Sequence, residues 1–65
     1  MHVAITGAAG EVGRTISPAF ESDRRTLFTH RDHEDVDSRL LDATDRDGFV
    51  EAFVDIDVDV LIHLV

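Results

Sequence analysis

Residues 3–13 read VAITGAAGEVG, an apolar run that leads directly into three glycines at three-residue spacing. Residues 3–6 are typical of a short buried strand, because apolar and β-branched side chains are followed at once by a turn residue. We call residues 7–13 the glycine loop. From about residue 10 to residue 20, apolar side chains recur at helical spacing. This part of the chain therefore predicts a strand, a glycine-rich turn and a helix in immediate succession.

Each glycine of this loop has its own expected role. Gly7 lets the chain turn sharply out of the strand, Gly10 leaves room for a pyrophosphate beside the backbone, and Gly13 lets the helix approach the sheet. The N–H groups at the start of the helix, those of Glu11 and Val12 included, would bind the anion together with the helix dipole. The Glu11 carboxylate is then expected to point to solvent. A glycine turn without a ligand is the alternative, which the flanking strand and helix disfavour.

The rest of the chain continues the alternation of strands and helices. Four further elements are expected in the order strand, strand, helix and strand, over residues 26–29, 39–41, 45–54 and 60–65. This order predicts an α/β protein, a partial Rossmann fold whose parallel sheet follows the order βαββαβ and is truncated after the fourth strand. The nearly continuous apolar run at 60–65 suits a strand buried on both faces. In this chain the fourth strand should pair beside the first and leave an open edge.

Several single residues carry local expectations. Pro18 removes a hydrogen bond and should kink the first helix or end it early. Thr44 is the expected N-cap of the second helix, whose apolar stripe consists of Phe49, Val50 and Phe53. His63 lies inside an apolar strand, where a hydrogen-bonded core histidine is the expected state rather than a catalytic base.

The glycine pattern resembles that of a known family. Thr-Gly-x-x-Gly-x-x-Gly at residues 6–13 is similar to the pattern of the extended short-chain dehydrogenases/reductases, the NAD-dependent epimerase/dehydratase group. Leu41-Asp42 before a helix resembles the aspartate of the family's third strand, and VLIHL at residues 60–64 resembles its fourth strand. Within the group, the chain is similar to the uronate dehydrogenase-like and archaeal sugar dehydrogenase branch. The resemblance implies that Asp42 and Ala43 lie at the adenine and Leu64 beside the cofactor.

The end of the second strand decides which dinucleotide is expected. A carboxylate at this position favours NAD, and an arginine can pair with the 2′-phosphate of NADP. His30 and Arg31 occupy the expected positions and neither is acidic, although Asp32 could serve with a shifted register. Arg31 as an ordinary loop arginine is equally compatible with the pattern. We expect NAD, with NADP as the alternative.

The residues that carry the family's chemistry are missing from this chain. The resemblance implies a Tyr-x-x-x-Lys pair as acid/base, yet the sequence contains no tyrosine and no lysine. Residues 1–65 are therefore expected to be the N-terminal part of an NAD(P)-binding Rossmann domain, without catalytic or substrate-binding parts. The alternative is a non-catalytic remnant or interaction module that binds no nucleotide. A homo-oligomer or a complementing C-terminal fragment is the expected macromolecular partner.

Composition limits the remaining possibilities. Fourteen acidic residues against six arginines give a formal net charge of −8, which argues against a nucleic-acid surface. Abundant aspartate without lysine indicates a halophilic protein, whose charge repulsion salt would screen. No apolar run approaches the roughly 20 residues of a membrane span, and we expect a cytoplasmic protein. Without cysteine there is no disulfide. His30 and His33 have metal-compatible spacing but no third ligand, so no metal site is expected.

Overall fold

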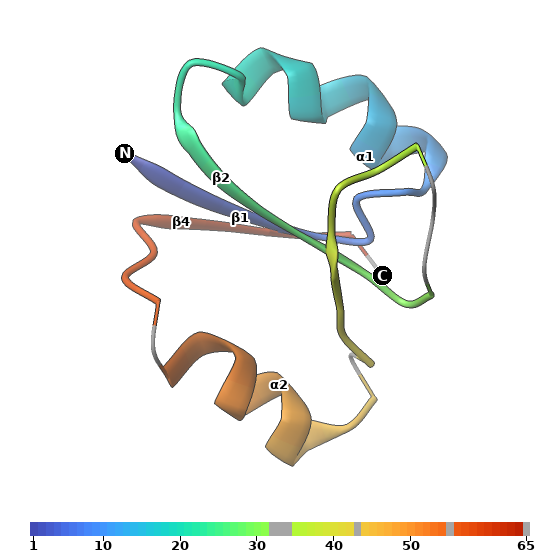
Figure 1. The fold of residues 1–65 in the computed structure, drawn as a ribbon, viewed down its shortest axis with the longest axis vertical. Coiled ribbons are helices and arrows are strands. Elements are labelled where there is room, and N and C mark those ends of the chain that lie inside the picture. Colours follow the sequence, from blue (N-terminus) through green and yellow to red (C-terminus); the bar gives the residue numbers. More distant parts are fainter. Residues whose placement is uncertain (32–34, 43, 55, 65) are drawn as a thin grey trace.

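A computed structural model describes residues 1–31, 35–42, 44–54 and 56–64. Its four strands form one parallel sheet in the order β3-β2-β1-β4. The strands are β1 (His2–Thr6), β2 (Arg24–Thr29), β3 (Arg39–Leu40) and β4 (Val60–His63). Two α-helices, α1 (Glu11–Ile16) and α2 (Arg46–Val54), lie on opposite faces of the sheet (Figure 1). The expected α/β architecture, a partial Rossmann-like fold, is confirmed.

Strand β1 is the centre of the sheet and is buried along its whole length. Its side chains alternate between two core clusters because successive residues of a strand point to opposite faces. Val3 and Ile5 belong to the cluster that includes Phe20, and Ala4 belongs to the cluster under α2 that includes Phe28. The glycine loop therefore starts from the most firmly packed strand of the molecule.

Helix α2 packs on the sheet through aromatic rings. Phe53 lies with its ring centroid 5.2 Å from that of Phe28 and 5.1 Å from that of Phe49. Val50, which we expected in the same stripe, is 56% exposed. That prediction is wrong, because Ala52 rather than Val50 joins Phe49 and Phe53 against the core. No helix in the described ranges is long and apolar enough to cross a membrane.

The end of the first helix agrees with the prediction from the sequence, and the N-terminal cap of the second helix differs from it. The first helix ends early, as Pro18 predicts, because α1 gives way to the 3₁₀ helix η1 (Ser17–Phe20). The expected cap of α2 is wrong. The Gly48 N–H donates to Asp45 Oδ1 at 3.2 Å, which makes Asp45 the capping residue, while the Thr44 hydroxyl donates to Asp42 instead.

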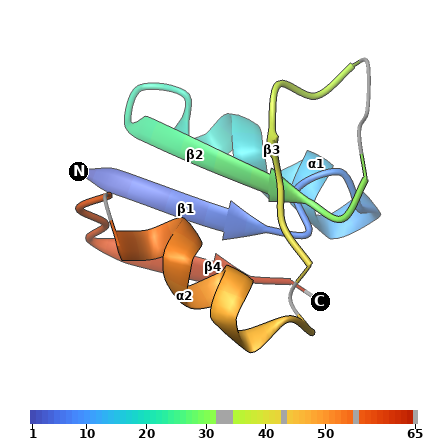
Figure 2. The ribbon, with the colours of Figure 1, turned by 60° about the horizontal axis from the view of Figure 1, so that its bottom comes forward.

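Strand β4 pairs with β1 and has no further neighbour among the described strands (Figure 2). The expected open edge is confirmed. Burial on both faces is not found, since Val60 is 37% and Leu61 44% exposed. His63 is also exposed rather than part of the core. The apolar run specifies a strand correctly, but at the edge of this sheet too few residues cover it.

Candidate functional site

The three glycines of the loop meet different neighbours. Gly7 has a φ of 65°, and a side chain there would overlap the Leu64 carbonyl oxygen. A Cβ on Gly13 would lie 2.7 Å from the Ala8 Cα, so α1 can lie against the loop only without a side chain. A Cβ on Gly10 would meet a single atom, the Gly7 carbonyl oxygen at 3.3 Å. Packing therefore requires glycine at positions 7 and 13, whereas a Cβ at position 10 would require only the Gly7 carbonyl to give way by a few tenths of an ångström.

Two cavities lie along the carboxyl ends of the strands and share Gly7 and Leu64. The first, of about 410 Å³, is lined by Thr6, Gly7, Phe28, His30, Leu41, Asp42, Thr44 and Leu64. The second, of about 450 Å³, is lined by Gly7, Gly10, Glu11, Val12, Gly13, His63 and Leu64. Open α/β sheets bind ligands at this end, where consecutive connections leave the sheet on opposite sides. In the order β3-β2-β1-β4 that point lies between β1 and β4.

In the first cavity, Asp42 is held by its neighbour Thr44. Asp42 Oδ1 accepts hydrogen bonds from the Thr44 hydroxyl at 2.6 Å and from the Thr44 N–H at 2.9 Å. The hydroxyl bond is the larger cause that lowers the pKa of Asp42, followed by the backbone bond and by the charge of His30. The carboxylate is thus fixed in its charged form beside the cavity. Ala43, also expected here, lies outside the described residues.

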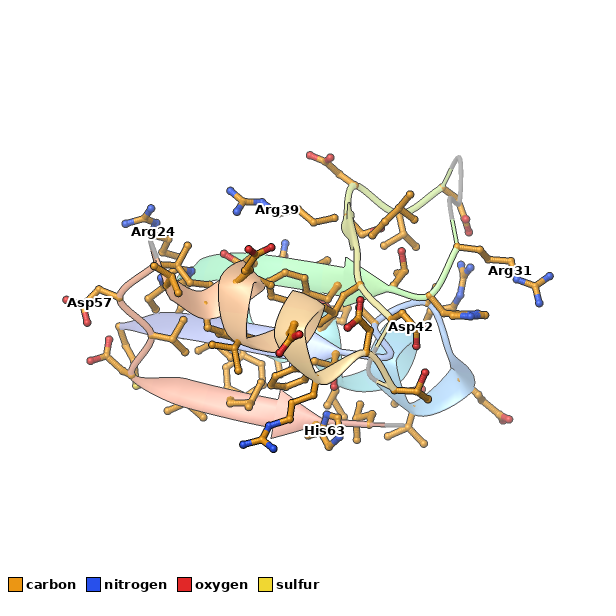
Figure 3. The ribbon with its side chains drawn as sticks, turned by 90° about the horizontal axis from the view of Figure 1, so that it is seen from below. Arg24, Arg31, Arg39, Asp42, Asp57 and His63 are labelled. Carbon is orange, nitrogen blue, oxygen red and sulfur yellow. The ribbon has the colours of Figure 1, made fainter. Side chains whose placement is uncertain are left out.

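The two candidate selectivity residues lie differently. His30 lines the first cavity together with Asp42, and Arg31 does not. Figure 3 shows the Arg31 side chain extending outward from the loop, away from Asp42. Asp32 and His33 lie outside the described residues. Of the two described positions considered for the ribose, His30 is therefore the one that lines the cavity.

A polar pair that the sequence analysis missed joins β1 to β4 between the two cavities. Thr6 Oγ1 lies 2.7 Å from His63 Nδ1 and accepts the Leu64 N–H at 3.1 Å. The His63 ring also contacts Phe49 edge-on, at 5.8 Å between centroids. The expectation of a hydrogen-bonded histidine is correct, and that of a core position is wrong. The signal was available, because Thr6 and His63 stand in register once β1 and β4 are paired.

Apart from the His63 ring, the described lining of the second cavity offers an anion only backbone N–H groups. Within the described ranges, no arginine lines either cavity, and Arg14 pairs with Asp35 and with the Ala9 carbonyl. The helix start at Gly10 has no side-chain cap. Glu11 is exposed at the rim. The described part of the chain also holds no group of three side chains that could bind a metal ion.

Comparison with known proteins identifies one related sequence. The chain is 46% identical over 64 residues to the L-arabinose 1-dehydrogenase (NAD(P)(+)) of Haloferax volcanii. The match covers 97% of this chain and 24% of the dehydrogenase, so the chain spans about a quarter of that protein's length. No family model matches, and no solved structure matches. The chain is thus similar to part of an NAD(P)-dependent oxidoreductase.

Proposed function

We propose that this chain is the dinucleotide-binding segment of an NAD(P)-dependent sugar oxidoreductase of the epimerase/dehydratase type. One observation carries the proposal: two cavities join at Gly7 and Leu64 and follow the carboxyl edge of the sheet over the glycine loop. The similarity to a dehydrogenase named for NAD(P)+ supports it. The uronate dehydrogenase-like branch and a cytoplasmic location, both expected from the sequence, belong to the same proposal.

The residues present fit such a ligand. The pyrophosphate would lie over Gly10, where no side chain obstructs the backbone, and would accept hydrogen bonds from N–H groups of Glu11 and Val12. The adenosine would occupy the apolar first cavity, whose walls include Phe28 and Leu41. Asp42 would accept a hydrogen bond from the adenine amino group. When bound, the nicotinamide supplies hydride transfer. NAD remains our first expectation, with NADP as the alternative.

Chemistry on a sugar requires residues that this chain does not contain. The family's acid/base pair consists of a tyrosine and a lysine, and the sequence has neither. A positioned acid/base group typically contributes about 10²–10⁴-fold to a rate. We therefore expect no turnover of hexoses, uronates or nucleotide sugars by the isolated chain, as followed by NADH or NADPH absorbance. Turnover that is lost in His63→Ala would contradict this expectation.

Titration with NADH tests the proposed binding. In the wild-type chain, NADH fluorescence should change in a saturable way, and Gly10→Val should abolish the change, because a branched side chain would fill the space above the loop. Gly48→Ala, a glycine replacement in α2 outside the lining of both cavities, is the control; its Cβ would lie 2.8 Å from Asp45 Oδ2, so that carboxylate must turn aside, but the variant should bind as the wild type does. Circular dichroism would show that both variants fold.

The same titration distinguishes the alternative function. A wild-type chain that folds but binds neither NADH nor NADPH would favour the non-catalytic remnant or interaction module. Equal affinity in the wild type and in Gly10→Val would place any bound dinucleotide away from the glycine loop, and the proposal in this form would be wrong.

A further inference from the structure

The polar pair between β1 and β4 fixes where the His63 ring carries its hydrogen. Thr6 Oγ1 accepts the Leu64 N–H at 3.1 Å and lies 2.7 Å from His63 Nδ1. Thr6 is only 2% exposed, so the hydrogen of its hydroxyl needs an acceptor within the protein. Among the described residues, His63 Nδ1 is the acceptor within hydrogen-bond distance. The hydroxyl therefore donates to Nδ1, and the neutral ring carries its hydrogen on Nε2.

The Nε2–H group of His63 has no hydrogen-bond partner among the described residues. The ring is held from two directions, because Nδ1 is bound to Thr6 and the ring contacts Phe49 edge-on, at 5.8 Å between centroids. Among the described residues that line the second cavity, only His63 has a side chain that can donate a hydrogen bond. An oriented donor without a partner thus stands at the cavity over the glycine loop.

The order of the strands indicates which part of a dinucleotide reaches this donor. Along the order β3-β2-β1-β4, Asp42 follows β3, Gly7 follows β1 and His63 ends β4 (Figure 3). Neighbouring strands lie about 4.8 Å apart. A ligand with its adenine at Asp42 and its pyrophosphate over the glycine loop therefore continues across the sheet toward β4. The next group of such a ligand is the ribose that bears the nicotinamide.

We propose that His63, held by Thr6 with its hydrogen on Nε2, binds a hydroxyl oxygen of the nicotinamide ribose. This inference rests on the proposed function and extends it to the second half of the cofactor. A hydroxyl oxygen accepts a hydrogen bond from a neutral imidazole N–H, so the contact needs no charge on the ring. His63 is then a binding residue, and Thr6 is a positioning residue that acts through it.

NMR of the histidine rings in the isotope-labelled chain tests the position of the hydrogen without any ligand. At about pH 8, where an ordinary imidazole is neutral, His63 should show a protonated Nε2 and an unprotonated Nδ1. Its signal is the one that is absent from His63→Phe. Thr6→Val should shift the ring toward the tautomer mixture of a free imidazole, whereas Thr6→Ser should keep the hydrogen on Nε2. In Thr6→Val the Leu64 N–H retains an acceptor, the backbone oxygen of residue 6 at 3.3 Å.

Calorimetric titration with ADP and ADP-ribose tests the contact with the ribose. ADP ends at the pyrophosphate and ADP-ribose carries the second ribose, so the ratio of their affinities isolates that ribose. In His63→Phe, which keeps a ring beside Phe49, this ratio should fall about threefold to tenfold, as expected for the loss of one neutral hydrogen bond. His63→Gln, whose amide can donate from a similar position, should recover part of the ratio.

Arg46→Gln is the matched control. Arg46 lines a third cavity, of about 310 Å³, together with His63, but it does not line the second. The ratio of affinities should therefore stay as in the wild type. If Arg46→Gln lowers the ratio and His63→Phe does not, the ribose lies in the third cavity and the assignment to His63 is overturned.

The remaining outcomes separate this inference from the proposed function. A wild-type His63 ring that is protonated on Nδ1 overturns the inference, whether or not the chain binds a dinucleotide. A wild type that binds both ligands, with an unchanged ratio in His63→Phe, overturns the role of His63 alone. A wild type that keeps its native circular dichroism and binds neither ligand overturns the proposed function, and the contact with the ribose with it.

Discussion

Strands β1 and β4 are neighbours with similar sequences and very different surroundings. Both are short apolar runs, and Ile5 of β1 stands in register with Ile62 of β4. Every residue of β1 is buried, whereas three of the four residues of β4 are exposed. The difference comes from position, because β1 has a strand on each side and β4 has a neighbour on one side only among the described strands. Hydrophobicity thus specifies that a strand forms, and its neighbours decide how far it is buried.

The largest expected effect is that of salt on the whole sheet. The chain carries a net charge of −8, and Asp57 and Asp59 immediately precede β4. The Debye length falls from about 10 Å at 0.1 M salt to about 3 Å at 1 M, so repulsion between these charges should relax. We expect the native circular dichroism to develop only as salt rises between about 0.05 M and about 3 M.

Hydrogen exchange at intermediate salt would resolve the two strands. The amides of β4 should lose protection before those of β1, because β4 lies at an edge beside these carboxylates. Sodium and potassium chloride should act alike if screening is the cause. A circular dichroism signal that is constant over the whole series would contradict both the salt adaptation and the order of release.

A smaller effect is expected from shortening the paired isoleucines. Ile5 is fully buried and Ile62 only partly so, so Ile5→Ala should lower the free energy of unfolding by about 2–5 kcal/mol. Ile62→Ala should lower it by about 1 kcal/mol, because part of its side chain remains in water in the folded state. Urea unfolding of both variants at one salt concentration measures the difference.

A small domain can be unfolded outright by the first of these changes. The milder variants Ile5→Val and Ile62→Val are then compared in place of the alanine variants. Ile5→Val should lower the free energy of unfolding by about 0.5–1.5 kcal/mol, and Ile62→Val should lower it by less. Equal losses at the two positions would mean that β4 is covered in solution, for instance by a second copy of the chain.

The same contrast explains what the sequence could predict. The structure of residues 3–13 is determined by the residues of that segment itself. Its apolar pattern specifies the strand, and the space around the backbone specifies the glycine turn. The predicted strand, turn and helix are confirmed. The exposure of His63 and Leu61 could not be predicted from the residues around them in the sequence, because it depends on how many strands flank β4. A strand buried on both faces and an edge strand can carry the same residues.

The candidate site divides in a similar way. Gly7 and Gly13 were identifiable because the structure demands glycine there, through a φ of 65° at Gly7 and through close contacts at both positions. Thr6, Phe28 and Thr44 were missed, although they line the first cavity, because single threonines and phenylalanines have no distinctive pattern. They reach the cavity through strand register, which links residues that are far apart in the sequence. Whether His30 or Arg31 lines the first cavity likewise depended on how the chain leaves β2.

The smallest expected effect concerns the opposite edge of the sheet, where β3 leads into the Asp42–Thr44 hydrogen bonds. Because these bonds lower the pKa of Asp42 in the folded chain, their stabilisation is fully present above the pKa of an unfolded aspartate, about 3.9. It is lost as the pH falls through the lower pKa of the folded state.

Thr44→Val removes the hydroxyl bond and should raise the pKa of Asp42 toward its ordinary value, whereas Thr44→Ser should keep it low. Carboxyl NMR titration measures both values. Urea unfolding should show Thr44→Val as the less stable protein at neutral pH and the difference as vanishing in acid. A pKa that is the same in both variants would mean that the hydroxyl does not hold Asp42 in solution.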